Sequence, residues 1–147
     1  MSAEFLIANL LRIAKGDLQD ARALAPSGSR NAIYLLEQSA EKVILAVLTS
    51  EGKRGNIKHL LHEMVDLVPD ENPLKPMLRA IEDLGIFATA YRYPTTVGRI
   101  KPAPAIAEFE KHATCVERAL TAAIAGFRVD PAASNAPAGT AKPIRAT

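Results

Sequence analysis

The stretch that decides the fold is Pro104–Phe127, PAIAEFEKHATCVERALTAAIAGF. Its apolar residues recur at steps of three and four, at Ile106, Phe109, Ala113, Val116, Leu120, Ala123 and Phe127. In a helix, residues at this spacing form one narrow apolar stripe. The spacing therefore predicts a helix over residues 104–127 that packs lengthwise against other helices.

The same spacing of apolar residues in the earlier part of the chain predicts four more helices, over about residues 2–25, 30–51, 57–68 and 73–92. At or just before the start of each lies a residue whose short polar side chain can cap free backbone N–H groups, namely Ser2, Ser29, Asn56 and Asn72. Residues 93–102 contain proline, glycine and β-branched residues, so we expect an irregular connection there. No internal repeat or strand-like alternation is evident. We predict an all-α, up-and-down bundle of four or five helices.

Composition sets limits on the class of protein. The chain has 147 residues, of which 48% are hydrophobic, and a single cysteine, which excludes a disulfide framework. No apolar run is long enough for a membrane span, and no basic segment precedes an apolar one at the start. We therefore expect a cytoplasmic protein that binds no membrane. Residues 128–147 are rich in Ala, Pro, Ser, Gly and Thr, so we predict a bundle over residues 1–127 followed by a flexible tail.

The net charge of +2 names no partner, but two windows contain no acidic residue. The first, between Glu51 and Glu63, holds Lys53, Arg54, Lys58 and His59, and the second, between Asp83 and Glu108, holds Arg92, Arg99 and Lys101. If every helix reverses direction, both connections lie at one end of the bundle. Cations gathered there suit a phosphate group. The alternative is that both windows are solvated loops without a ligand.

Several local motifs bear on chemistry. In Tyr91-Arg92-Tyr93-Pro94, a ring can stack on a base while the arginine holds a phosphate, although both rings can equally pack on the bundle. His59 and His62 share a helix face, but a third metal ligand is not evident, so we predict no metal or other cofactor. The polar residues of Leu36–Val43 are expected on a solvated helix face.

The spacing Arg54-x4-His59 is compatible with a catalytic role in RNA cleavage. Ribonucleases that need no metal use an arginine to stabilise the phosphate and a histidine to transfer protons. Arg54 and His59 are therefore the catalytic residues of an alternative hypothesis, a metal-independent endoribonuclease. This spacing also arises often by chance.

Three of these segments together resemble a known family. Gln38-Ser39-Ala40-Glu41-Lys42 resembles the "QAxEK" signature of HEPN domains. His59-Leu60-Leu61, followed by Met64 and Pro69, resembles the family's third segment, and Tyr91–Pro94 resembles the "RYP" close of its fourth helix. The segments come in the family's order and span about residues 15–95.

This resemblance implies a helical bundle that forms homodimers. Some members bind nucleotides or accompany a nucleotidyltransferase, which here would be a separate partner, and others are RNA-cleaving toxins with an Arg-x4–6-His motif. In the toxins that motif sits on a later helix and is followed by x-Tyr, whereas Leu60-Leu61 follow His59 here. The resemblance therefore favours an accessory or toxin–antitoxin-type module that binds without cleaving.

The leading hypothesis combines both windows into one site for a nucleotide or RNA phosphate. Its residues are Lys53, Arg54, Lys58, His59, Arg92, Tyr93, Arg99 and Lys101. A third hypothesis is an interaction module whose apolar stripes bind a partner protein and no ligand.

Overall fold

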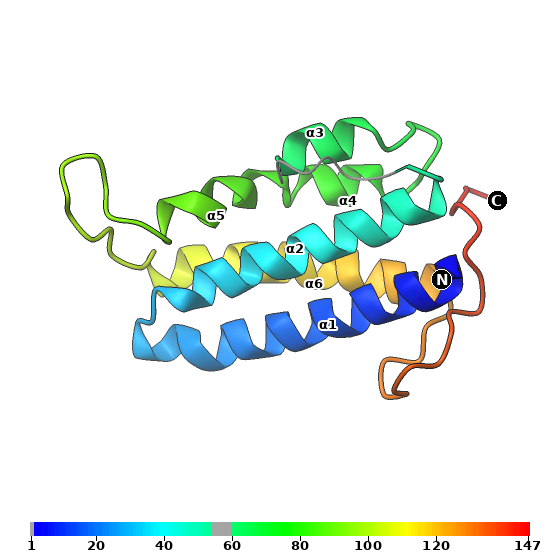
Figure 1. Ribbon diagram of the computed structural model, residues 1–147, viewed down its shortest axis with the longest axis horizontal. Coiled ribbons are helices and arrows are strands. Elements are labelled where there is room, and N and C mark those ends of the chain that lie inside the picture. The colour runs from blue at the N-terminus through cyan, green and yellow to red at the C-terminus, as the bar shows by residue number, and fades with distance from the viewer. Residues whose placement is uncertain (1, 54–59) are drawn as a thin grey trace.

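The computed structural model describes residues 2–53 and 60–147 and confirms the all-helical prediction. Its elements are α1 (Ala3–Leu24), η1 (Ala25–Ser27), α2 (Asn31–Ser50), α3 (Leu61–Asp66), α4 (Lys75–Arg79), η2 (Glu82–Ile86), α5 (Phe87–Ala90) and α6 (Ile106–Gly126). The three long helices, α1, α2 and α6, lie side by side, and the short elements from α3 to α5 form a second layer along α2 (Figure 1). No helix of the described chain is long and apolar enough to cross a bilayer.

Helix α2 is the centre of the bundle, because it packs against α1, α6, α3, α5 and η2. It is joined to α1 by polar contacts as well as by apolar ones. The hydroxyl of Ser39 donates a hydrogen bond to the carbonyl oxygen of Ala14 at 2.7 Å, and Nζ of Lys42 lies 2.8 Å from Oδ2 of Asp17. Glu37 and Ser39 are fully buried, so the prediction of a solvated face over residues 36–43 is wrong.

The predicted helix over residues 73–92 is divided into α4, η2 and α5. Asn72 is buried, and its side-chain oxygen accepts a hydrogen bond from the backbone N–H of Leu74 at 2.9 Å, so regular helix begins only at Lys75. Gly85 brings η2 against α3, where an added Cβ would lie 3.3 Å from Cγ of Leu61. Glycine also disfavours helix. The break therefore follows from a tertiary contact that the helical period does not reveal.

Residues 128–147 form no helix or strand, yet they are packed on the bundle. The backbone N–H of Ala138 donates to the carbonyl oxygen of Glu4 at 2.9 Å, and Val129 and Ala138 are buried. Arg145 reaches both carboxylate oxygens of Glu51, at 2.7 and 2.9 Å. The segment therefore crosses the ends of α1 and α2 (Figure 1), in place of the free tail that its composition predicts.

Candidate functional site

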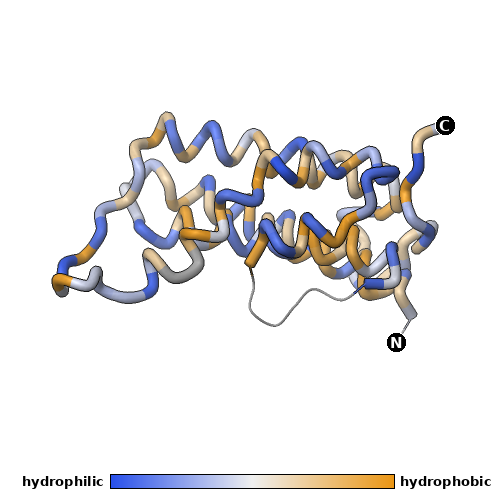
Figure 2. The backbone as a smooth tube through the Cα atoms, turned by 90° about the horizontal axis from the view of Figure 1, so that it is seen from above, coloured by the Kyte–Doolittle hydropathy of each residue, from blue (hydrophilic) through white to orange (hydrophobic). Residues whose placement is uncertain are grey.

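The loop over residues 91–105 projects beyond the bundle at the end where α2 begins (Figures 1 and 2). Arg30 directly precedes α2, and the Ser29 hydroxyl accepts the backbone N–H of Asn31 at 3.2 Å. The Arg30 guanidinium donates to two carbonyl oxygens of the loop, that of Lys101 at 2.6 Å and that of Tyr91 at 3.0 Å. The base of the loop is thereby fastened to the start of α2.

Cations and tyrosine rings are interleaved at this end. The Arg30 guanidinium lies over the Tyr91 ring at 5.5 Å, and Nζ of Lys101 lies over the same ring at 5.6 Å. The Arg92 guanidinium lies over the ring of Tyr34, in the first turn of α2, at 5.7 Å. We call the residues gathered here the loop-end cluster: Arg30, Tyr34, Tyr91, Arg92, Tyr93, Arg99 and Lys101. It includes all three tyrosines of the chain.

Two tyrosines of the cluster differ in exposure, since the Tyr91 ring is buried and the Tyr93 ring is exposed. Burial raises the pKa of the Tyr91 phenol, with a smaller contribution from the nearby Glu108 carboxylate, while Arg30 opposes both. Tyr91 is therefore a neutral support that packs under Arg30 and Lys101 at physiological pH. Tyr93, in contrast, is 65% exposed and presents its ring to solvent.

Arg99 is held by a tight turn within the loop. The backbone N–H of Thr95 donates to the carbonyl oxygen of Arg99 at 2.7 Å, and that of Gly98 donates to the carbonyl oxygen of Thr95 at 2.7 Å. The Thr95 hydroxyl accepts the backbone N–H of Arg99 at 3.1 Å. Gly98 has φ +76°, the left-handed conformation that glycine adopts without strain. The backbone at Arg99 is therefore fixed before any ligand arrives.

Most of the chain matches a known family. A family model described as "HEPN domain" matches residues 7–124. The chain belongs to the HEPN domain family. The crystal structure of TT1696 from Thermus thermophilus shares the fold with this HEPN domain, with a TM-score of 0.63 and 18% identity, covering 80% of this chain and 94% of that one. No curated protein matches the chain.

The family confirms the resemblance that the three motifs carried, and with it the helical bundle. It leaves the finer predictions open. The homodimer, the nucleotidyltransferase-type partner and the RNA or nucleotide ligand stay predictions for this HEPN domain.

Lys53, from the first acid-free window, lies far from the second window. Lys53 follows the C-terminal end of α2, where its Nζ donates to the carbonyl oxygen of Leu67 at 2.8 Å. Arg30 precedes the N-terminal end of the same 20-residue helix, and such a helix is about 30 Å long. The prediction that Lys53 joins Arg92, Arg99 and Lys101 at one end is therefore wrong.

The reason is that α3 has only six residues and does not run the length of the bundle. A prediction in which every helix spans the bundle therefore places the later connection at the end opposite to the one where it lies. The elements from α4 to α5 return along α2 toward its start (Figure 1). Arg54, Lys58 and His59 lie outside the described residues. Their predicted binding roles, and the catalytic roles of Arg54 and His59, stay predictions.

Sequence reasoning found four residues of the cluster, Arg92, Tyr93, Arg99 and Lys101, because they share one acid-free window. It missed Arg30 and Tyr34. Both occupy the first residues of the predicted second helix at a spacing of four, the spacing that puts side chains on one helix face. A cation and an aromatic residue at this spacing, Arg30 and Tyr34, are the sequence signal that could have indicated this part of the site.

Within the described residues no cation of the cluster forms an ion pair, and the carboxylate found near it is that of Glu108, which raises the pKa of Tyr91. The ion pairs found there involve cations elsewhere, namely Arg22, Lys42, Lys75, Arg79 and Arg145. Cation–π contacts and bonds to carbonyls orient a guanidinium but leave its net charge in place. The loop-end cluster is therefore a positively charged surface that can attract an anion.

A groove of about 410 Å³ between α1 and α6 offers a contrast. Its walls include Arg22, whose guanidinium lies 3.1 Å from a carboxylate oxygen of Glu117 and 4.0 Å from one of Glu110. The Arg22 side chain holds the pKa of the Glu117 carboxyl below its ordinary range. Its arginine is already paired, which leaves Lys15 as the other cation among the residues that line it, so this groove is a poorer place for a phosphate than the loop-end cluster.

Proposed function

We propose that this HEPN domain binds the phosphate groups of a nucleotide or of RNA at the loop-end cluster. The observation that carries the proposal is that three cations lie over two tyrosine rings, Arg92 over Tyr34 and both Arg30 and Lys101 over Tyr91. The same loop carries Arg99 and the exposed Tyr93, and among the described residues none of these cations forms an ion pair with a carboxylate. Phosphate recognition needs such cations, and base recognition in single strands uses exposed aromatic rings.

In this proposal each residue of the cluster has a role that follows from its exposure and contacts. Arg92 and Arg99 supply guanidinium groups to the phosphates, and Lys101 adds a third charge. The exposed ring of Tyr93 stacks on a base. Tyr34 and Tyr91 lie beneath the cations and hold them outward. Binding of this kind needs no bond-breaking residue, which fits an accessory module.

The test is fluorescence anisotropy with two probes, a labelled single-stranded RNA of ten nucleotides and a labelled ATP, which separate the two sources of phosphate. We expect saturable binding of at least one probe that weakens as salt rises. With the RNA, Arg92→Ala and Arg99→Ala should each weaken binding and flatten the plot of log affinity against log salt by about 0.7.

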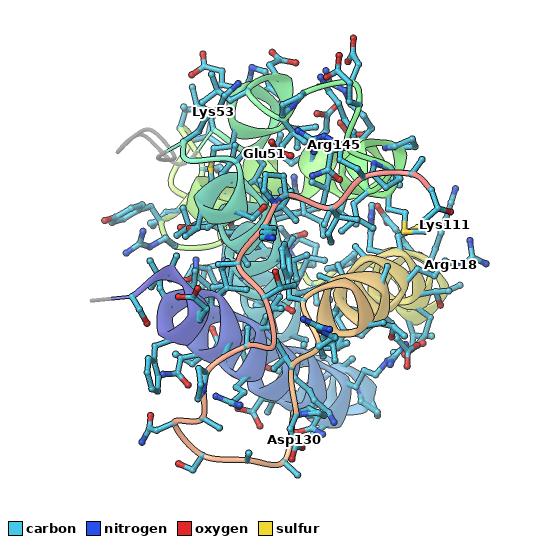
Figure 3. The ribbon with its side chains drawn as sticks, turned by 90° about the vertical axis from the view of Figure 1, so that its right-hand side faces the viewer. Glu51, Lys53, Lys111, Arg118, Asp130 and Arg145 are labelled. Carbon is cyan, nitrogen blue, oxygen red and sulfur yellow. The ribbon has the colours of Figure 1, made fainter. Side chains whose placement is uncertain are left out.

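Arg118→Ala is the matched control, because Arg118 is an exposed arginine on α6 (Figure 3). Binding by wild type that survives both loop substitutions, or that falls equally in the control, would contradict the proposal. The endoribonuclease alternative is measured on the same RNA in EDTA. Cleavage that disappears in both Arg54→Ala and His59→Ala would establish that alternative instead.

A further inference from the structure

Arg30 has an unusual place in the loop-end cluster, because two of its guanidinium nitrogens bond to backbone carbonyl oxygens. Nε donates to the carbonyl oxygen of Lys101 at 2.6 Å and Nη2 to that of Tyr91 at 3.0 Å. Its guanidinium carbon also lies 5.5 Å from the centroid of the Tyr91 ring. These three contacts join the start of α2 to both ends of the segment that carries Arg92 and Arg99.

We propose that Arg30 is the positioning residue of the phosphate site. It holds the two ends of the loop as a clamp, and thereby positions Arg92, Arg99 and Lys101 for phosphate. Arg30 itself does not contact phosphate. This inference rests on the proposed function for its effect on binding. The clamp itself is a property of the protein without ligand.

The geometry requires an arginine at this position. The planar guanidinium offers donors in two fixed directions and a flat face, so it can reach two carbonyls and lie against a ring at once. A lysine ammonium offers one compact charge and no flat face. Arg30→Lys therefore keeps the positive charge while it loses the clamp, which makes it the informative conservative variant.

Loss of the clamp should loosen the loop without unfolding its turn. The bonds between Thr95, Gly98 and Arg99 lie within the loop and do not involve Arg30. The turn would then move as a unit relative to the bundle, and a ligand would have to order it. Ordering a mobile segment costs binding free energy, which a fastened loop avoids.

The first experiment uses the protein without ligand. Hydrogen exchange, followed by mass spectrometry of peptides that cover residues 92–101, should be faster by about tenfold in Arg30→Ala and Arg30→Lys, since hydrogen bonds of a charged donor are lost. Trypsin should also cleave after Arg99 sooner in both variants. Exchange and cleavage equal to those of wild type and of Arg118→Ala would overturn the clamp.

The second experiment measures binding of the ten-nucleotide RNA at several salt concentrations. Arg30→Ala and Arg30→Lys should both weaken binding by about tenfold while the salt slope stays that of wild type, because no phosphate contact is removed. Arg99→Ala should change both affinity and slope. A slope that falls in Arg30→Ala as it does in Arg99→Ala, or full affinity in Arg30→Lys, would overturn the positioning role.

The two failures are distinguishable. If wild type binds neither RNA nor ATP, the proposed function is wrong, and the exchange experiment alone decides whether Arg30 fastens the loop. Circular dichroism melting of each variant confirms that the helices remain folded.

Discussion

The two ends of α2 carry arginines in opposite circumstances. At the C-terminal end, Arg145 donates to both carboxylate oxygens of Glu51, a side chain only 4% exposed that also accepts a bond from Asn72 at 2.9 Å (Figure 3). At the N-terminal end, Arg30 and Arg92 face carbonyl oxygens and tyrosine rings. The first arrangement pairs the arginine with a carboxylate and fastens the C-terminal segment. In the second, neither arginine has a carboxylate partner among the described residues, so Arg30 fastens the loop while the charge of Arg92 is left for a ligand.

This difference shows why the number of basic residues says little about binding. The two ends contain the same kind of side chain, and only the partner atoms distinguish a structural arginine from one that can attract phosphate. Changes at the C-terminal end of α2 should therefore alter stability, and changes at the N-terminal end should alter binding.

Deletion of residues 128–147 should destabilise the bundle most. It removes the buried Val129 and Ala138, the packing of Ile144 and the bonds of Arg145 to Glu51. Loss of this apolar burial costs about 3 kcal/mol, which lowers Tm by about 6–12 °C in a domain of this size. Thermal melting by circular dichroism measures it, and an unchanged Tm would mean that the segment is a free tail.

Tyr93→Ala should weaken RNA binding at the loop end without changing Tm. The ring is largely exposed, so its loss removes little packing, while one base stack contributes about 1–3 kcal/mol of binding free energy. Anisotropy should therefore show a loss of roughly 5- to 150-fold. Tyr93→Phe keeps the ring and should bind as wild type does. Equal losses in both variants would argue against stacking.

Arg145→Ala should have a smaller effect on stability than deletion of the whole segment. The substitution leaves the nearly buried Glu51 carboxylate with the bond from Asn72 but without its two bonds from Arg145. We expect Tm to fall by about 2–4 °C while RNA binding at the opposite end stays unchanged. A loss of RNA affinity in this variant would show that the two ends are coupled.

The pH dependence of this same pair gives the smallest effect. Hydrogen bonds from Arg145 hold the pKa of Glu51 below its ordinary value of 4.5, with Asn72 and Lys53 acting in the same direction against burial. A carboxyl with a lowered pKa stabilises the folded state above its unfolded pKa and loses that contribution as the pH falls through its folded pKa. The stability difference between wild type and Arg145→Ala should therefore be full at pH 6.

That difference should shrink as the pH falls below about 4.5. Urea denaturation midpoints at pH 6, 4.5 and 3.5 measure it. Asp70 and Glu117 also have lowered pKa values, but they are present in both proteins and cancel in the comparison. A difference that grows toward acid pH would contradict the assigned pairing.

The long helices could be predicted from the sequence because their apolar period is a local property. Residues 2–25, 30–51 and 104–127 were expected, and α1, α2 and α6 begin and end within two residues of those limits. The division of residues 73–92 could not be predicted in the same way. It depends on the buried Asn72 and on the approach of Gly85 to Leu61, which are contacts between segments.

The candidate site also contains residues with a local sequence signal and residues that only the fold brings together. Arg92, Tyr93, Arg99 and Lys101 were found because they are neighbours in the sequence. Arg30 and Tyr34 join them only through the fold, and Lys53 is separated from them by the length of α2. The packing of residues 128–147 was missed because isolated contacts attach it, namely Arg145 on Glu51, hydrogen bonds from Arg12 to two of its carbonyl oxygens, and a few buried apolar residues. None of these contacts gives a periodic signal in the sequence.

The bond from Ala138 to Glu4 brings the first and last segments of the chain to one side of the molecule, away from the loop over residues 91–105 (Figure 1). A fluorescent protein or a surface linker attached at either terminus would thus leave the tyrosine-bearing end facing solution. The same proximity would allow the first and last segments of this chain to be joined by a linker and new ends to be opened near Val97, giving a circular permutant in which Tyr93 and Arg99 lie on different terminal segments.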